Sequence, residues 1–191
     1  MTSSDLIALH ARASGRFDEI VDEIPDDAWD RPTPCTEWTV RDLLAHMTYE
    51  AAWAPPLLAG ATLAEVGDRF DGDLLGDDPK GAFHAANAGE VAAAADPGVL
   101  NRDVHTSMGI LPAREYLSQR LSDLVVHAWD LATAIRVDPL LDAEAVEHCY
   151  TASLPWEDAL RASGLFGERI EVPDDADVVT KLLALFGRRS G

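Results

Sequence analysis

The sequence feature that most constrains the fold is a long, regular repeat of apolar residues between positions 112 and 136. Apolar side chains recur there at intervals of three and four residues, which places them on one face of an α-helix. Pro112 suits the first turn of such a helix, and the Val-Asp-Pro segment at 137–139 ends the pattern. The apolar face consists of Leu117, Leu121, Leu124, Val125, Ala128, Leu131, Ala132 and Ile135. The repeat therefore predicts one long amphipathic helix that must bury this face against other elements.

Similar spacing of apolar residues predicts further helices on both sides of this one. Their ranges are 3–24, 39–54, 79–95, 142–162 and 178–186, with a short helix at 63–70. Thr39 and Asp42 form a capping box at the start of the second helix, and Pro55 with Pro56 ends it. Residues 99–111 are expected to form an irregular connection with short extended pieces. We therefore predict an all-α fold, a single domain over residues 1–191, in which a four-helix bundle carries an additional C-terminal helical segment.

The charge of the chain argues against two classes of partner. There are 15 Lys+Arg and 34 Asp+Glu, so the net charge is −19 at pH 7. A surface this acidic repels phosphate backbones and anionic lipid headgroups, so neither nucleic acid nor membrane is an expected partner.

The sequence also predicts where the protein is located. No apolar run approaches the roughly 20 residues of a membrane-spanning helix, and the N-terminus does not resemble a signal peptide. Because Cys35 and Cys149 make no disulfide framework, we expect a reducing, cytoplasmic location.

A polar stripe on the longest predicted helix is the first candidate site. Asp123, His127 and Asp130 are spaced i, i+4 and i+7, so they fall within about 60° of one another around the helix. In one interpretation, side chains one turn apart bind a metal ion from the same side. In the other, the stripe is simply the solvent-exposed face opposite the apolar one, because it also contains Gln119 and Arg120.

His46 favours the metal interpretation. It lies on the predicted helix 39–54 among apolar neighbours, a setting in which a histidine is usually structural. A bundle can nevertheless bring this helix against helix 112–136. His46, Asp123 and His127 would then supply two nitrogens and one carboxylate, a ligand set that leaves positions open for water or substrate. Asp130 would orient a ligating imidazole from beside the ion.

The remaining histidines and cysteines are weaker candidates for chemistry. We expect the other four histidines to be structural or solvated: His10, His84, His105 and His148. A nucleophilic cysteine needs a lowered pKa and an adjacent base, and the sequence around Cys35 supplies neither. Cys35 is therefore expected to act as a small buried hydrophobe.

Three stretches of the chain together resemble a known family. Residues 34–47 read PCTEWTVRDLLAHM, residues 120–132 read RLSDLVVHAWDLA, and residues 172–188 read VPDDADVVTKLLALFGR. They are similar to the second-helix signature, the metal helix and the C-terminal tail of the actinobacterial metal-binding group of the DinB-like superfamily. That group is related to the N-terminal domain of mycothiol-dependent maleylpyruvate isomerase. The resemblance spans nearly the whole chain and is weakest at residues 57–110.

The resemblance implies a DinB-like four-helix bundle with a divalent metal, zinc or nickel, at one end. By position, His46 and His127 match two ligands, and Asp123 stands where better-known relatives have Glu or His. Asp130 matches a residue expected beside the bound cofactor. Family members of known activity use a low-molecular-weight thiol, whose pKa the metal lowers. The resemblance therefore also implies a thiol such as mycothiol and a small-molecule substrate.

Three hypotheses about function follow. The first is a metal- and thiol-dependent transferase or isomerase, with substrate entering over the metal beside the loops at 57–78 and 99–111. The second is a non-catalytic protein that binds a metal or a small molecule. The third is a structural bundle without an ion. A homodimer is compatible with each of them, with exposed Trp53, Trp129 or Trp156 marking the contact.

Overall fold

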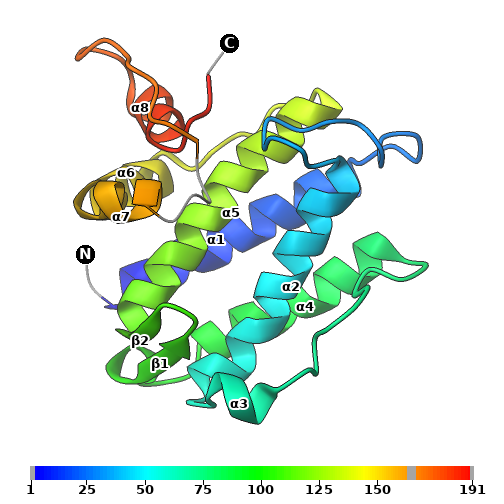
Figure 1. Cartoon of the computed structure of the whole chain (residues 1–191), viewed down its shortest axis with the longest axis vertical. Helices are drawn as coiled ribbons and strands as arrows, with labels where there is room; N and C mark the ends of the chain where they lie inside the picture. The colour runs from blue at the N-terminus through cyan, green and yellow to red at the C-terminus, as the bar shows by residue number, and fades with distance from the viewer. Residues whose placement is uncertain (1–2, 163–166, 190–191) are drawn as a thin grey trace.

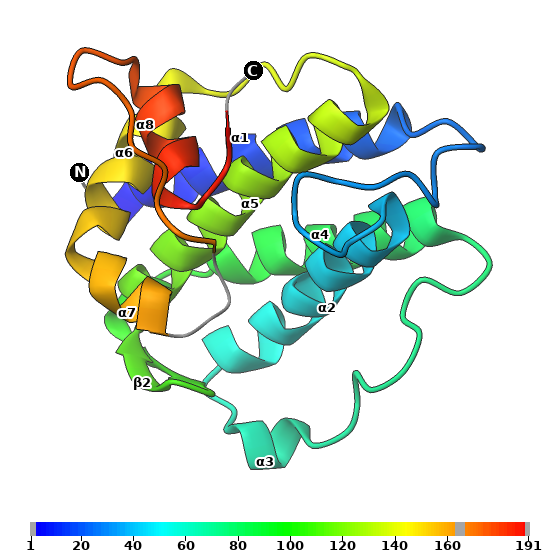
Figure 2. The same cartoon turned by 45° about the horizontal axis from the view of Figure 1, so that its top comes forward.

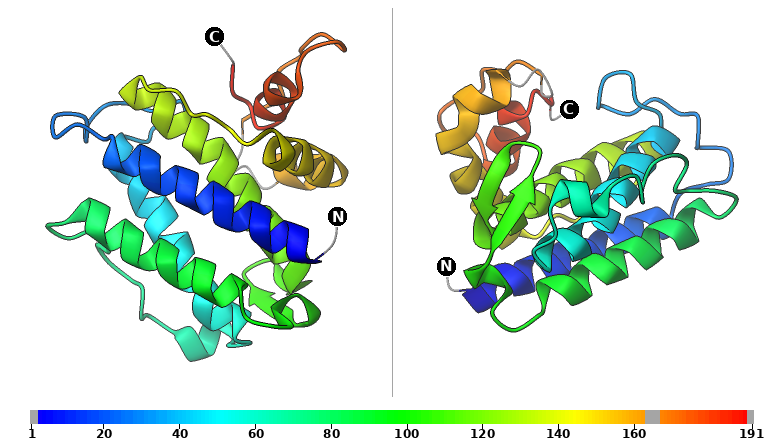
Figure 3. Two further views of the ribbon diagram at one scale, coloured as in Figure 1. Left: turned by 180° about the vertical axis from the view of Figure 1, so that it is seen from behind. Right: turned by 60° about the horizontal axis from the view of Figure 1, so that its bottom comes forward.

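Four long helices form the body of the protein. The computed structural model describes residues 3–162 and 167–189. The four helices are α1 (Ser3–Asp22), α2 (Val40–Leu58), α4 (Pro79–Ala94) and α5 (Ala113–Ile135). Helix α1 packs along α5 and also contacts α4, while α2 packs along α4 and also contacts α5. The view from behind in Figure 3 shows α1 between α4 and α5, and Figure 1 shows α2 in front of α4. The predicted helical fold is confirmed.

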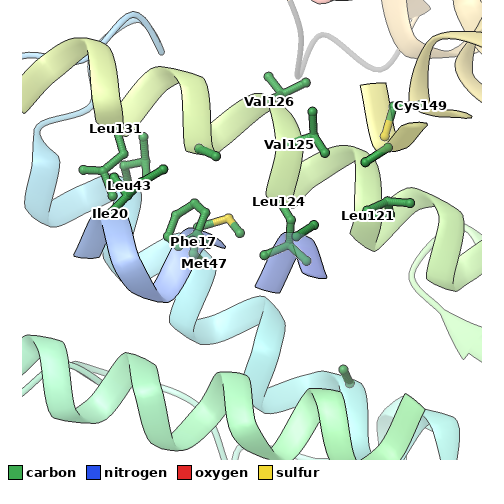
Figure 4. Close-up of a cluster of buried hydrophobic side chains, with 14 of the residues drawn as sticks. Phe17, Ile20, Leu43, Met47, Leu121, Leu124, Val125, Val126, Leu131 and Cys149 are labelled. Carbon is green, nitrogen blue, oxygen red and sulfur yellow. The ribbon is translucent and has the colours of Figure 1, made fainter. Parts of the chain in front are cut away.

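The core lies where the apolar faces of these helices meet. Phe17 and Ile20 of α1, Met47 of α2 and Leu131 of α5 are fully buried, and they belong to one cluster (Figure 4). All eight apolar residues predicted on one face of α5 are buried. Burying a large aliphatic side chain contributes roughly 1.5–3 kcal/mol. The face identified from the sequence is therefore the one that attaches α5 to the bundle.

The start of α2 is determined locally. The Thr39 hydroxyl accepts a hydrogen bond from the backbone N–H of Asp42, and the Asp42 carboxylate accepts one from the Thr39 N–H. This is the predicted capping box, and it lies one residue before the first helical residue, Val40. Because the cap fixes where the helix begins, it also fixes which way every later side chain of α2 points.

The predicted end of α2 at Pro55 and Pro56 is wrong. Both prolines lie inside the helix, which continues to Leu58. A proline cannot donate a backbone hydrogen bond, but its carbonyl can still accept one, and the carbonyls of these two prolines accept closing bonds from the N–H groups of Ala59 and Ala61. The last turn of α2 therefore remains hydrogen-bonded on its C-terminal side.

Residues 99–112 are more regular than the sequence predicted. After a 3-10 turn (Val99–Asn101), β1 (Asp103–Thr106) and β2 (Gly109–Pro112) pair as an antiparallel hairpin. Gly109 has a φ of 116°, which residues with a side chain rarely adopt, so glycine permits this turn. The expected short extended pieces are therefore present, and the expected irregular connection is corrected to a small two-stranded sheet at the start of α5 (Figure 1).

A C-terminal layer of shorter helices covers α5. Helix α6 (Ala143–Ser153) contacts α5, and α8 (Val178–Leu185) contacts α6. The predicted helix 142–162 is interrupted by a 3-10 turn at Leu154–Trp156, after which α7 (Glu157–Ala162) begins. Pro155, which has no backbone N–H to donate, lies in this turn. Figure 2 shows α8 near α6, and the segment that follows α8 reaches α5 through Arg188, which contacts Asp130.

Of the three tryptophans that were predicted to be exposed, one lies at the surface. Trp156 is 45% exposed, but Trp53 and Trp129 are half-buried, so their predicted exposure is wrong. Trp53 packs against the core and against the ring of Phe70, which is on the segment after α3 (Leu63–Val66). Within the described ranges, none of the helices combines the length and the apolar character needed to cross a membrane.

Candidate metal centre

Helices α2 and α5 bring three potential metal ligands together. His46 Nε2 lies 3.4 Å from Asp123 Oδ2, and His127 Nε2 lies 3.3 Å from Asp123 Oδ1. One ligand atom from each of the three residues lies within 4.8 Å of the other two. Asp123 and His127 share one face of α5 because they are four residues apart, whereas His46 is 77 positions away from Asp123 and reaches the site only through the packing of α2 beside α5.

The polar stripe of α5 is not a solvated face. The side chain of Asp130 is 0% exposed and that of His127 is 7% exposed, while Asp123 retains 22%. Arg120, on the same stripe, is also buried. The interpretation of this stripe as solvent-exposed is therefore wrong. Helix α5 is covered on more than one side, by α1, by α2 and by the C-terminal layer, so its polar stripe also lies inside the protein.

A loop closes one side of the site. The chain between α1 and α2 folds back on itself: Pro32 and Thr39 form an isolated bridge, and the N–H of Thr33 donates to the carbonyl of Trp38. This places the Trp38 ring 4.8 Å from that of His46 and, nearly parallel, 5.8 Å from that of His127. The indole therefore restricts both imidazoles and excludes water from one side of them.

His127 is oriented by a chain of buried groups. Its Nδ1 lies 3.0 Å from Asp130 Oδ2, and Asp130 in turn accepts two hydrogen bonds from the guanidinium of Arg188, at 2.8 and 3.2 Å. With Nδ1 held by a carboxylate, Nε2 is the nitrogen that faces Asp123 and His46. Asp130 thus contacts one of the three potential metal ligands, and its predicted place beside a bound cofactor stays a prediction. Arg188 lies after α8, in the stretch 172–188 that resembles the family. Its contact with Asp130 could not be predicted from the sequence, because the two residues are far apart along the chain.

Asp123 is held from the opposite direction by Arg120. The Nη1 of Arg120 donates to Asp123 Oδ2 at 2.6 Å. The rest of the guanidinium faces Glu90 of α4, whose two carboxylate oxygens accept from Nε and Nη2 at 3.0 and 3.1 Å. His10 Nε2 of α1 lies 3.0 Å from the same Glu90. A buried ionic cluster across three helices therefore fixes the carboxylate of Asp123.

The electrostatics of the site favour ionised groups. Burial alone would lower the pKa of His127, but Asp123 and Asp130 outweigh it and raise that pKa to about 9. Burial alone would raise the pKa of Asp123, but the imidazoles of His127 and His46 hold that pKa well below its ordinary value. Asp130 behaves in the same way, with His127 and Arg188 lowering its pKa against burial. A cation that replaces the proton of His127 would meet two ionised carboxylates.

The donor set fits a divalent metal. His46 Nε2 is buried, and no group within hydrogen-bonding geometry of it is found among the described residues. A buried nitrogen without a partner costs free energy unless something else binds to it. Two imidazole nitrogens and one carboxylate oxygen are ligands that zinc and nickel accept, and three protein ligands leave further positions open.

The other predicted candidates lie elsewhere or play structural roles. His84 lies between Asp18 and Asp22 at distances of 2.8 and 3.0 Å, and His148 lies 3.1 Å from the Ser118 hydroxyl. Burial raises the pKa of the Cys149 thiol to about 12. Within the described residues, the only group of three or more potential ligands is the one formed by His46, Asp123 and His127.

Cys35 lies beside the candidate centre rather than in the core. It is half-buried, and its thiol is close enough to Arg188, Asp130 and Asp123 for their charges to act on it. Burial raises its pKa against the opposing effect of Arg188. The expectation of a small buried hydrophobe therefore holds only in part, because the thiol sits next to charged groups.

Comparisons with known proteins place this geometry in context. The family described as the mycothiol maleylpyruvate isomerase N-terminal domain matches residues 10–132, which include His46, Asp123 and His127. Two relatives, described as uncharacterized proteins of two Mycobacterium tuberculosis strains, are each 30% identical over 190 residues, or 96% of this chain and 98% of theirs.

Two crystal structures of the mycothiol-dependent maleylpyruvate isomerase, one of a histidine-to-alanine mutant, are similar in fold. They match 88% of this chain and 75% of their own, with TM-scores of 0.65 and 0.64. Their sequences are 15% and 16% identical to this one. At this level of identity, the likeness shows the arrangement of the helices and nothing about the chemistry.

Proposed function

The chain belongs to the family of mycothiol maleylpyruvate isomerase N-terminal domains, and we propose that it binds a divalent metal and acts as a thiol-dependent transferase or isomerase. His46, Asp123 and His127 would hold the ion, zinc or nickel, and Asp130 would support His127 from beside it. The substrate would be a small molecule that reacts with the thiol.

The observation that carries this proposal is the convergence of three donors. One atom each from His46, Asp123 and His127 falls within 4.8 Å of the other two, and the buried Nε2 of His46 has no hydrogen-bond partner among the described residues. His84, which lies outside the cluster, has a carboxylate within hydrogen-bond distance of each ring nitrogen. The convergence of three donors, together with the nitrogen of His46 that is left without a partner in the described structure, is what supports a bound ion here.

The residues of the chain prepare the site in three ways. Arg120 and Arg188 keep the carboxylates of Asp123 and Asp130 in place. Trp38 covers the two imidazole rings on one side. A divalent ion bound here would supply positive charge that lowers the pKa of a coordinated thiol, so that the thiol is a better nucleophile at neutral pH.

The use of a thiol is supported by the family alone. The crystallised isomerase of similar fold is mycothiol-dependent, so mycothiol is the first thiol to test. A non-catalytic metal-binding protein is the alternative, and it predicts an ion without thiol binding.

Elemental analysis of purified protein after reloading with zinc tests the metal site. We expect about one ion per chain in wild type, and less than a tenth of that in His46→Ala and in His127→Ala. His84→Ala is the matched control, because His84 also contacts carboxylates but lies outside the donor cluster. Full zinc content in either site variant, with the fold verified by circular dichroism, would contradict the ligand assignment.

Calorimetry with mycothiol then tests the second part of the proposal. We expect the zinc-loaded protein to bind mycothiol, and the metal-free protein to bind it at least ten times more weakly. Zinc retention without any mycothiol binding would support the non-catalytic alternative instead.

A further inference from the structure

Arg120 lies between two glutamates that have very different surroundings. Glu90 of α4 forms a bidentate ion pair with Arg120, in which its two carboxylate oxygens accept from Nε and Nη2 of the guanidinium at 3.0 and 3.1 Å. Glu50 of α2 approaches its Nη1 only to 3.8 Å, which is beyond hydrogen-bond distance. The same Nη1 donates to Asp123 at 2.6 Å. One guanidinium therefore links both glutamates to the candidate metal centre.

The side chain of Glu90 is completely buried, and both of its oxygens have partners inside the protein. Its side chain is 0% exposed, and its oxygens face Arg120 and His10. Burial alone would raise the pKa of Glu90, but Arg120 and His10 outweigh it and lower that pKa to about 2. A carboxylate so strongly paired cannot accept a proton near neutral pH.

Glu50 differs in each of these respects. Its side chain is 35% exposed, and its nearest cationic group in the described structure is the one at 3.8 Å. Burial raises the pKa of Glu50, opposed by Arg120, while the charges of Asp123, His46 and Glu90 also act on it. Two neighbouring carboxylates with pKa values shifted in opposite directions are typical of sites in which one is structural and the other transfers protons.

The position of Glu50 connects it to the donor cluster. It follows His46 by four residues on α2, so the two side chains share one face of that helix. Arg120 precedes Asp123 by three residues on α5 and reaches toward both carboxylates. Glu50 therefore lies one helical turn from His46, on the side of α2 that reaches Arg120 of α5, and about a third of its side chain is exposed.

The other titratable groups near the centre are unsuited to this task. His127 has one ring nitrogen on Asp130 and the other toward Asp123. Asp130 is buried against Arg188. Tyr116 lies on the same stripe of α5, but burial raises the pKa of its phenol, which stays neutral and cannot accept a proton. Among these groups, Glu50 alone combines exposure with incomplete pairing.

We propose that Glu50 is the general base that takes the proton from the thiol when the thiol binds. The S–H bond breaks, its electron pair stays on sulfur, and the proton moves to the carboxylate of Glu50. The step needs no oxidant or further reactant. This inference rests on the proposed function, since it concerns the thiol that the metal centre would bind.

The proton balance of thiol binding tests this role. Calorimetric titrations of zinc-loaded protein with mycothiol, in buffers of different ionisation enthalpy, measure the protons released per thiol bound. At pH 7.5 we expect wild type to release fewer protons per bound thiol than Glu50→Gln, because part of the proton stays on the carboxylate of Glu50. Glu50→Asp keeps a carboxylate and should release less than Glu50→Gln. Glu147→Gln, at an exposed position of α6, is the control and should match wild type.

The outcomes separate this inference from the function on which it rests. Equal proton release by wild type and Glu50→Gln, with zinc content and mycothiol binding retained, would overturn the role of Glu50 and leave the metal and thiol assignments intact. Loss of zinc in Glu50→Gln would also overturn it, because Glu50 would then support the metal rather than accept a proton. No zinc or no mycothiol bound by wild type would overturn the proposed function and this inference together.

Discussion

Two ionic clusters lie next to each other inside the bundle and are organised in opposite ways. In the closed cluster, formed by His10, Glu90 and Arg120, both oxygens of Glu90 face a cationic or hydrogen-bonding partner at 3.0–3.1 Å. In the open cluster, formed by His46, Asp123 and His127, the donor atoms face one another, and His46 Nε2 has no partner within the described residues. Both clusters use α5, and Arg120 contacts both.

This difference between the two clusters suggests that the closed cluster stabilises the fold and that the open cluster binds a ligand. A buried ion pair offsets the cost of desolvation by satisfying its own charges, so the carboxylate of Glu90 and the guanidinium of Arg120 are already paired. Donors that converge on one another need a positive charge between them, which either a proton or a metal ion can supply. The closed cluster therefore accounts for how α1, α4 and α5 hold together, and the open cluster is where chemistry is expected. The following predictions test this division.

The largest expected effect is in the closed cluster. Glu90→Gln keeps the size of the side chain but removes the carboxylate that faces Nε and Nη2 of the buried Arg120, which then keeps only Asp123 as a close partner within the described ranges. Breaking a buried ion pair in this way typically costs about 3–5 kcal/mol. We expect the free energy of unfolding in urea to fall by that amount. Glu147→Gln, which alters an exposed glutamate, should change it by less than about 0.5 kcal/mol. An unfolding free energy of Glu90→Gln equal to that of the control would remove the structural role of this cluster.

A smaller effect is expected from pH in the metal-free protein. The pKa of His127 is raised to about 9 in the fold, against about 6.5 for an unperturbed histidine. A raised pKa contributes stability below pH 6.5 that is lost as the pH rises through 9, here about 3 kcal/mol. We expect urea unfolding of the metal-free protein to show this decline between pH 6.5 and 9.

The same experiment distinguishes the open cluster from the rest of the molecule. His127→Asn lacks the titrating imidazole, so its unfolding free energy should vary less over this pH range. Zinc-loaded wild type should not show the decline, because the ion replaces the proton and binds more tightly as the pH rises. A flat profile for metal-free wild type would mean that His127 does not hold a proton between the two carboxylates.

The smallest of these effects is expected beside the open cluster. Asp130→Asn keeps the shape of the side chain but weakens its hold on His127 and on Arg188. Changes of this kind beside a metal ligand typically reduce metal affinity by about 10–100-fold. Competition with a zinc chelator of known affinity measures the change, with His84→Ala as the control. An unchanged zinc affinity would show that Asp130 stabilises the fold without supporting the ligand.

The sequence was most informative where spacing along one helix decides the outcome. The apolar face of α5 was predicted residue by residue because a 3.6-residue period places those side chains together regardless of what they contact. The capping box at Thr39 and Asp42 was equally local. The same reasoning grouped Asp123, His127 and Asp130 on one stripe, yet it could not decide whether that stripe faced solvent.

The errors lie where non-local contacts decide the structure. Pro55 and Pro56 were expected to end α2, but their carbonyls still accept closing hydrogen bonds. The hairpin of β1 and β2 has only four residues in each strand, too few for a period of two to stand out. Trp53 was expected at the surface but is half-buried, because it packs against Phe70, which belongs to a separate segment of the chain.

By itself, then, the sequence determined which helices form, which of their faces are apolar and which residue types share a turn. Only the tertiary structure decided that His46 meets Asp123 and His127, that Arg188 reaches Asp130 across 58 residues, and that Arg120 joins the two clusters. The physical reason is the range of the interactions. Periodicity and capping act within a few residues of one helix, whereas the relative placement of helices depends on how whole faces pack against each other.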